Sequence, residues 1–348
     1  EGASNLVGAF DVSTSVYSQS LSVAAKETDP NGIVFNPTGS KMFVTGTSSD
    51  AVNEYALSVL FDVTTAVFTQ SFSVSAQTLA CRGLTFNPAG TEMFVVDGYS
   101  GGIRQYTLST GFDVSTTSYT RNFSTVSQDG DPHGVAFNTD GTKMFVIGVA
   151  SDSVNEYTLS SGFDISTSVF VDAFSIAAQE TQPQDVVFNA DGTKMFIVGV
   201  ATDTVFQYTL STGFDASTAS YDSVSFSVAS QDTSPQGMTF SPDGTKLYII
   251  GAQNDSAYEY TVGTTTYTNQ MDKTQLDAVT DPNHIALSND LDLAIVLNLT
   301  SGTTVPSSNG VAINYDANII NKGAVLGTDY DYDAPAQDKV RITALAAN

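Results

Sequence analysis

A unit of 51 residues recurs five times, and this repeat constrains the fold more than any other feature of the chain. Its first phrase is Phe-Asp, then an apolar residue, then Ser or Thr, and it begins at Phe10, Phe61, Phe112, Phe163 and Phe214. A second phrase follows each copy and contains an apolar run, a turn with Gly and then Met-Phe-Val or a close variant, at 32–44, 83–95, 134–146, 185–197 and 237–249. Periods of about this length are typical of solenoids, propellers and arrays.

Each unit contains four short runs of β-branched and aromatic residues. In the third copy we expect strands at 134–138, 143–148, 153–160 and 168–176. The first two runs are apolar on both faces, which predicts a sheet covered on both sides. The third and fourth runs alternate between apolar and polar residues, which favours wetter, outer positions. The pattern as a whole predicts an all-β protein.

The first two strands of each unit are joined by a turn that ends in Gly. The turn reads Asn-Pro-Thr-Gly, Asn-Thr-Asp-Gly or a similar sequence, which is typical of a tight hairpin. We expect positive φ at the turn glycines, which are Gly39, Gly90, Gly141, Gly192 and Gly244. A four-stranded antiparallel sheet that is buried on both faces and repeated in tandem is a propeller blade.

The Gly turn followed by Met-Phe-Val, together with VNEYTLS (154–160), resembles the blade rhythm of YVTN and WD40-like propellers. The resemblance covers about residues 1–263 and implies the architecture of a β-propeller. It implies little about function, because propellers host enzymes, lectins, scaffolds and adhesins.

The number of blades follows from counting strands. The fourth-strand phrase has an orphan copy at 16–23, whereas the last copy, 237–263, lacks its fourth strand. We therefore predict that 16–23 pairs with 257–263 and closes a ring of five blades without open edges. A sixth blade stays open as an alternative, because 282–299 loosely repeats the inner hairpin.

After Gly263 the period fails, so we predict a propeller domain at 1–263 and a small β-module at 264–348. We expect strands at 283–288, 291–299, 310–315, 323–327, 329–333 and 339–345, with a turn cluster at 303–309. This tail resembles a terminal β-module of structural proteins from tailed marine phages, which implies a role in attachment or assembly. A β-sandwich packed beside the ring is the plainer alternative.

The amino-acid composition limits the kinds of molecule that this chain can bind. The net charge is −25 although only 14% of residues are charged, because basic residues are scarce. Such a chain repels nucleic acid and anionic membrane and favours cations, basic partners or uncharged ligands such as glycans. No apolar run approaches 18 residues, so we expect no membrane insertion. The single cysteine, Cys81, is expected to be a loop thiol of no special role.

The sequence contains no His-Glu-x-x-His and no phosphate-binding Gly loop, and no cluster with metal-ligand spacing lies near its two histidines. Asp329, Asp331 and Asp333 alternate along an expected strand and could hold Ca²⁺, but they lack the spacing of a calcium loop, so we predict no cofactor. The better candidates are polar residues at one rim of the channel. One set stands just before the innermost strands. Every copy has a different or long polar residue there although its surroundings repeat closely, and such divergence is what a shared asymmetric pocket requires. Its members are Asn31, Arg82, His133, Gln184 and Gln236.

A second set on the same rim is Asp50, Asp152, Asp203 and Asp255, with Gly101 at the equivalent place in the second copy. Asp before a strand commonly satisfies its own turn amides, and that structural role is the favoured interpretation. As the alternative, four carboxylates on one rim would make the channel mouth negative and could attract a cation.

We therefore predict a non-enzymatic virion protein of a marine phage that displays the propeller for adhesion or glycan binding and assembles through 264–348, with homo-oligomers expected. A secreted or cell-surface bacterial adhesin is the alternative. A hydrolase or lyase at the channel mouth is the remote one, and it would require His133 and Arg82 to converge with an Asp of the rim.

Overall fold

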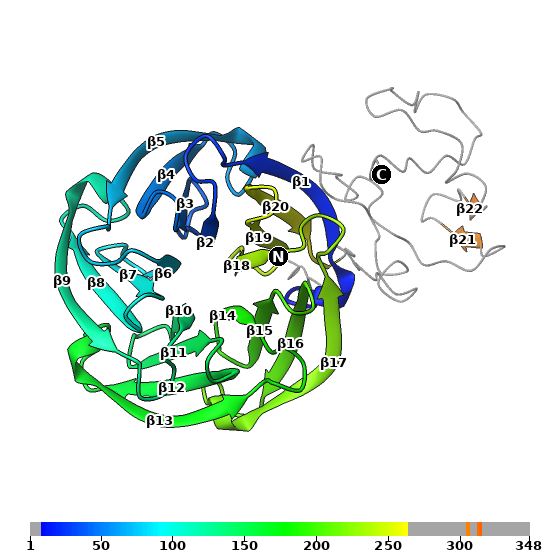
Figure 1. Cartoon of the computed structure of the whole chain (residues 1–348). Coiled ribbons are helices and arrows are strands. Elements are labelled where there is room, and N and C mark those ends of the chain that lie inside the picture. The colour runs from blue at the N-terminus through cyan, green and yellow to red at the C-terminus, as the bar shows by residue number, and fades with distance from the viewer. Residues whose placement is uncertain (1–7, 264–303, 307–311, 315–348) are drawn as a thin grey trace. The chain divides into compact units, whose positions relative to one another are not determined.

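The computed structural model describes residues 8–263, 304–306 and 312–314 of the chain. Residues 8–263 form one compact unit, a ring of five four-stranded antiparallel sheets around a central axis (Figure 1). The prediction of a five-bladed β-propeller is thus confirmed.

The first four blades each follow one another along the chain, and in each the first strand is the innermost (Figure 1). Blade 1 consists of β2 (Pro30–Phe35), β3 (Lys41–Gly46), β4 (Ala51–Leu57) and β5 (Ala66–Ser73). Blade 2 consists of β6 (Cys81–Phe86), β7 (Glu92–Asp97), β8 (Gly102–Leu108) and β9 (Thr117–Ser124). Blade 3 consists of β10 (Pro132–Phe137), β11 (Lys143–Gly148), β12 (Ser153–Leu159) and β13 (Ser168–Ser175). Blade 4 consists of β14 (Pro183–Phe188), β15 (Lys194–Gly199), β16 (Thr204–Leu210) and β17 (Ala219–Ser227).

Blade 5 joins the two ends of the ring. Its inner strands are β18 (Pro235–Phe240), β19 (Lys246–Gly251) and β20 (Ser256–Thr261), and its outer strand is β1 (Val16–Ser22). β1 runs antiparallel to β20, with Val16 opposite Thr261 and Leu21 opposite Ala257. This pairing confirms the predicted clasp and leaves β20 without an open edge. The segment that could form a sixth blade lies outside the described residues.

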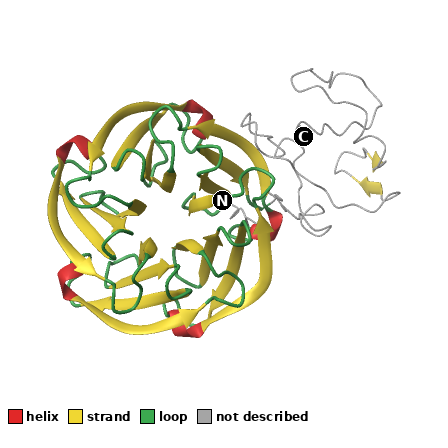
Figure 2. Ribbon diagram, viewed as in Figure 1, coloured by secondary structure: helices red, strands yellow, loops and turns green. Residues whose placement is uncertain are grey.

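Five short 3₁₀ helices lie at the periphery of the ring, each just before an outer strand (Figure 2). The Asp of each Phe-Asp phrase precedes one of them, and in four of the five its carboxylate accepts a hydrogen bond from the helix, as Asp164 does from the N–H of Ser166 (3.1 Å). The helices are η1 (Val12–Thr14), η2 (Val63–Thr65), η3 (Val114–Thr116), η4 (Ile165–Thr167) and η5 (Ala216–Thr218).

The Phe of the same phrase packs on the Gly of the inner hairpin. Gly141 has φ 72°, and a Cβ there would lie 2.3 Å from the ring of Phe163. The Phe163 N–H also donates to the Gly141 carbonyl (2.9 Å). The five turn glycines all have positive φ, as predicted. The two phrases recur together because they are two sides of one contact.

The core lies between the blades. Each hydrophobic cluster combines side chains from neighbouring blades, for example Phe145 of β11 with Met195 of β15. Cys81 belongs to such a cluster as the first residue of β6 and is fully buried, so the prediction of a loop thiol is wrong. Burial raises the pKa of this thiol strongly.

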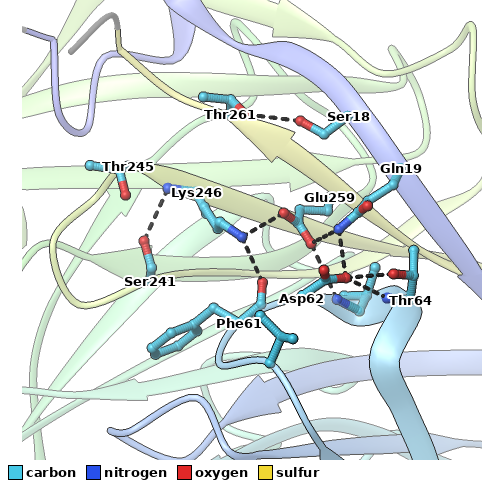
Figure 3. A network of polar contacts seen from close by, with 12 residues as sticks. Ser18, Gln19, Phe61, Asp62, Thr64, Ser241, Thr245, Lys246, Glu259 and Thr261 are labelled. Carbon is cyan, nitrogen blue, oxygen red and sulfur yellow. Dashed lines mark hydrogen bonds and ion pairs between the residues drawn. The ribbon is translucent and has the colours of Figure 1, made fainter. Parts of the chain in front are cut away.

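Buried charges join neighbouring blades on the third strands. Lys246 Nζ lies 2.7 Å from Glu259 Oε1 and donates to the Phe61 carbonyl of the next blade (2.9 Å), while Glu259 Oε2 accepts from the Val63 N–H (3.2 Å) (Figure 3). Gln19 of the clasp strand also donates to Glu259 (2.9 Å). Ion pairs at Lys41–Glu54 and Lys143–Glu156 repeat this arrangement. The expectation of a wet third strand is therefore wrong, because its carboxylates are buried and paired, whereas the fourth strands do alternate.

After Gly263 in the sequence, the structure describes β21 (Thr304–Pro306) and β22 (Ala312–Asn314), which pair antiparallel. β22 falls within the strand predicted at 310–315, whereas β21 stands where a turn cluster was predicted. The other strands predicted after Gly263, and Asp329, Asp331 and Asp333, lie outside the described residues. In the part of the chain that the structure describes, no helix is long and apolar enough to cross a bilayer.

Candidate functional site

The residues of the first predicted set all lie at one end of the channel. Each is the second residue of an innermost strand, at the point where the pairing with the next strand slips by one. Such β-bulges turn a side chain away from the regular pleat and are frequent beside active sites. Asn31, His133 and Gln184 are buried, and Arg82 and Gln236 are partly buried. The predicted rim is therefore a recessed ring of side chains.

Asn31 and Arg82 form one hydrogen-bonded pair across blades 1 and 2. Arg82 Nη1 donates to Asn31 Oδ1 (3.2 Å), and Asn31 Nδ2 donates to the Asp29 carbonyl (2.6 Å). Arg82 Nε is buried and has no hydrogen-bond acceptor among the described residues. A guanidinium with a free N–H donor is suited to bind a carbonyl or an anionic oxygen.

His133 and Gln184 form a second pair across blades 3 and 4. Gln184 Nε2 donates to the Gln182 carbonyl (3.1 Å), so Gln184 Oε1 accepts from His133 Nδ1. The proton of the neutral imidazole is thereby held on Nδ1, and Nε2 carries the lone pair. Within residues 8–263, Nε2 is buried without a hydrogen-bond partner and lies 3.4 Å from Asp131 Oδ1.

The surroundings of His133 favour its neutral form. Burial lowers its pKa, and the positive charge of Arg82 lowers it further, while Asp131 acts in the opposite direction. His133 is thus an uncharged base at neutral pH. Its neighbour Asp131 was not predicted, although it stands two residues before His133 in the sequence.

Gln236 does not join either pair. Its Nε2 donates to Ser234 Oγ (2.9 Å) within its own blade. The five candidate residues are therefore arranged asymmetrically, with one hydrogen-bonded pair between blades 1 and 2 and another between blades 3 and 4.

The second predicted set serves the backbone. Asp50, Asp152, Asp203 and Asp255 have φ between 44° and 52°, and Gly101 takes the same place with φ 67°. Their carbonyls accept a hydrogen bond from the end of the outer strand, as Asp152 does from Ile176 (2.9 Å). Burial raises the pKa of Asp152, and the nearby Asp129 and Glu180 add to this effect. These residues form the turns before the third strands through their backbone. The predicted side-chain bonds to their own turn amides are not seen, because Oδ1 of Asp50, Asp152 and Asp203 is buried without a hydrogen-bond partner among the described residues.

A further set of acids was not predicted from the sequence. Glu27, Asp129, Glu180 and Asp232 stand three residues before the innermost strands and are 1% exposed. Each accepts backbone N–H groups from two loops, as Glu180 does from Gln182 (2.8 Å) and Thr202 (3.2 Å). In blade 2, Asp97 takes this role with Thr78 as partner (2.6 Å). These carboxylates fix the loops that surround the ring of candidate residues.

Among the described residues, no three His, Cys, Asp or Glu side chains lie in positions suited to bind a metal ion. The prediction that the protein uses no cofactor stays a prediction.

No protein-family model matches the chain, and no curated protein matches it. Solved structures of similar fold include a protein of unknown function from Desulfotomaculum acetoxidans, with 16% identity, coverage of 64% of this chain and 65% of that chain, and a TM-score of 0.42. A Bacteroides uniformis protein described as a proposed 6-phosphogluconolactonase has 15% identity, 63% coverage of both chains and a TM-score of 0.41. The periplasmic gluconolactonase of Pseudomonas aeruginosa has 15% identity, 68% coverage of both and a TM-score of 0.39.

The chain spans less than two thirds of the length of the first two of these proteins. The comparisons contradict the prediction of a non-enzymatic virion protein, because the similar structures that carry a functional name are named as lactonases. They show neither a YVTN or WD40-like repeat family nor a link to phage proteins, adhesion or receptor binding. At this level of identity the likeness is one of fold, so the activity of this chain depends on its own residues.

Proposed function

We propose that this protein is a small-molecule hydrolase whose active site is the channel end that contains Arg82, Asp131 and His133. The observation that carries the proposal is the buried, neutral His133, whose Nε2 is free beside a carboxylate and a guanidinium. A positioned imidazole with a lowered pKa is suited to general base catalysis near neutral pH.

The roles follow from the hydrogen bonds. His133 Nε2 takes a proton from a water molecule, whose oxygen attacks a substrate carbonyl carbon. The guanidinium of Arg82, which is partly exposed, binds the carbonyl oxygen as it becomes negative. The carbon–oxygen bond to the leaving group then breaks, and His133 returns the proton to the departing oxygen. Gln184 is a positioning residue that holds the proton of the resting imidazole on Nδ1.

Access to Nε2 requires one side chain to move. Nε2 is covered in this structure, and the neighbouring Asp131 side chain is 43% exposed. A shift of Asp131 opens Nε2 to water and places the carboxylate where it can orient that water. We expect a small substrate because the site is recessed, and one with a carbonyl group, such as an ester or a sugar lactone.

The test is hydrolysis of a panel of aryl esters and sugar lactones, phosphorylated ones included, by the protein and by H133Q. Gln already occupies the equivalent position of blades 4 and 5, so this variant keeps the fold. We expect kcat to fall at least about 100-fold, the usual contribution of a general base. In the unchanged protein, kcat/KM should rise with pH through a pKa below 6.5 and then level off.

V169A on the outer strand β13 is the matched control, because Val169 is exposed and distant from the channel in sequence and blade position. Its activity should equal that of the unchanged protein. Absence of hydrolysis across the panel, or equal rates for H133Q, would show the proposal to be wrong.

We also keep the proposal that 264–348 mediates assembly into homo-oligomers. It is supported by apolar strand-like phrases in a short segment, such as DLAIVLNL (292–299).

A further inference from the structure

One position on the innermost strands breaks the five-fold repeat. The third residue of these strands is Gly32, Gly83, Gly134 and Gly237 in four blades, and Asp185 in blade 4. The exception is a charged residue in a place that otherwise carries no side chain at all.

The glycines lie where neighbouring inner strands approach each other closely. A Cβ at Gly83 would lie 2.6 Å from the His133 carbonyl, and one at Gly237 would lie 2.9 Å from the Asn31 carbonyl. Neighbouring inner strands therefore approach each other too closely for side chains. A Cβ at Gly134 would lie 2.6 Å from Asp185 Oδ1, so the carboxyl group of Asp185 occupies space that a glycine leaves free.

Asp185 is buried but not paired with a cation among the described residues. Its Oδ1 accepts from the Val186 N–H and its Oδ2 from the Met238 N–H of β18, both at 2.9 Å. Burial raises its pKa to about 7, and these two hydrogen bonds act in the opposite direction. The ionisable side chains on β14 and on the strands packed against it (β10, β11, β15 and β18) are His133, Lys143 and Lys194, and none of them contributes to this shift. Each oxygen retains capacity for another donor.

A cavity of about 310 Å³ lies against this carboxyl group. Its wall combines apolar side chains, such as Val34, Leu84 and Met238, with polar groups, such as Thr85, and Asp185 is the only ionisable group among the lining residues that the structure describes. Lining residues in the hairpin turns, such as Pro242, are exposed, so the cavity reaches solvent at the end opposite to His133. Its volume is within the range of small-ligand sites.

We propose that this cavity binds a small organic ammonium ion, with Asp185 as its counter-ion and the apolar side chains of the wall around its carbon chain. An ammonium group brings N–H donors to the free lone pairs of the carboxylate, and its charge offsets the cost of burying that carboxylate. A divalent metal ion would need several oxygen ligands from charged groups, which the cavity does not supply. An anion would meet the negative charge of Asp185.

Isothermal titration calorimetry with n-butylammonium chloride tests the proposal. We expect one binding site per chain at pH 8 and affinity about tenfold weaker at pH 6, where most of Asp185 holds a proton. The D185G variant should bind at least about tenfold more weakly. It is expected to fold, because four of the five blades carry Gly at this position. D185N, which keeps the size of the side chain and removes its charge, should lose affinity to the same degree.

Three controls separate the outcomes. Circular dichroism melting verifies that both variants are folded, and 1-butanol tests whether binding occurs without a charge on the ligand. Sodium and calcium chloride test for an inorganic cation. Equal affinity of D185G and the unchanged protein, equal binding of 1-butanol, displacement by inorganic cations or absence of binding would each overturn the proposal. H133Q should bind the ammonium ion normally, so this test is separate from that of hydrolysis.

Discussion

Asp185 should take up a proton on folding at mildly acidic pH. Its pKa is about 7 in the folded protein and 3.8 in an unfolded chain. Between these values the folded state holds a proton that the unfolded state has lost, so stability decreases as pH rises from about 4 to 7. From pH 5 to pH 8, we expect the free energy of unfolding to fall by on the order of 2 kcal/mol relative to D185N. Urea denaturation of both proteins at the two pH values measures this difference. The same pH dependence in D185N would exclude Asp185 as its source.

The candidate residues could be found from sequence, but their chemistry could not. Divergence at one column of an otherwise regular repeat identified Arg82 and His133. The lone pair on His133 Nε2 depends on Gln184, which is 51 residues away and held by a third residue. The signal for Asp185 is present in the repeat, as DVVF where other copies have Gly, but its burial beside a cavity becomes visible only in the folded ring.

At the scale of elements, the contact between the inner hairpin and the lead-in to the outer strand should be sensitive to a single methyl group. In G141A, the left-handed backbone and the Phe163 ring both oppose the new Cβ. We expect a loss of about 2 kcal/mol, or roughly 4–8 °C in Tm. G130A is the matched control, because a Cβ at Gly130 meets nothing within 4 Å, and its Tm should change by less than about 2 °C. Equal Tm values for the two variants would refute this account.

Strand positions followed from periodicity because hairpin turns and apolar runs act locally. In blade 3, the predicted boundaries agree with the observed ones within two residues. The burial of the third strands could not be predicted from periodicity. Glu156 in VNEYTLS is 2% exposed and paired with Lys143. A buried carboxylate with a partner from another strand has the same sequence pattern as a solvated one.

For the whole molecule, ring closure should depend on β1 and not on the segment after Gly263. A chain of residues 23–348 lacks β1, so β20 loses its partner strand and presents an open edge. We expect this chain to melt at least about 10 °C lower and to aggregate. A chain that ends at Gly263 keeps every blade and should melt within a few degrees of the full chain, because residues 8–263 form a compact unit by themselves. A similar Tm for all three chains would show that the clasp contributes little.

Light scattering on the full chain and the chain ending at Gly263 also tests the proposed assembly role of 264–348. The full chain should be an oligomer and the shortened chain a monomer. A full chain that is monomeric at micromolar concentration would remove that role.

The clasp also has a consequence for synthesis on the ribosome. Gln19 of β1 meets Glu259 of β20, 240 residues later in the chain. At roughly 5–20 residues per second, β1 leaves the ribosome about 12–50 s before its partner exists. Four blades can fold during this delay, whereas the earliest strand must wait. Its sequence, VYSQSLS, contains four polar residues among seven, three of them consecutive, which suits a strand that must stay unpaired in water without associating with other nascent chains.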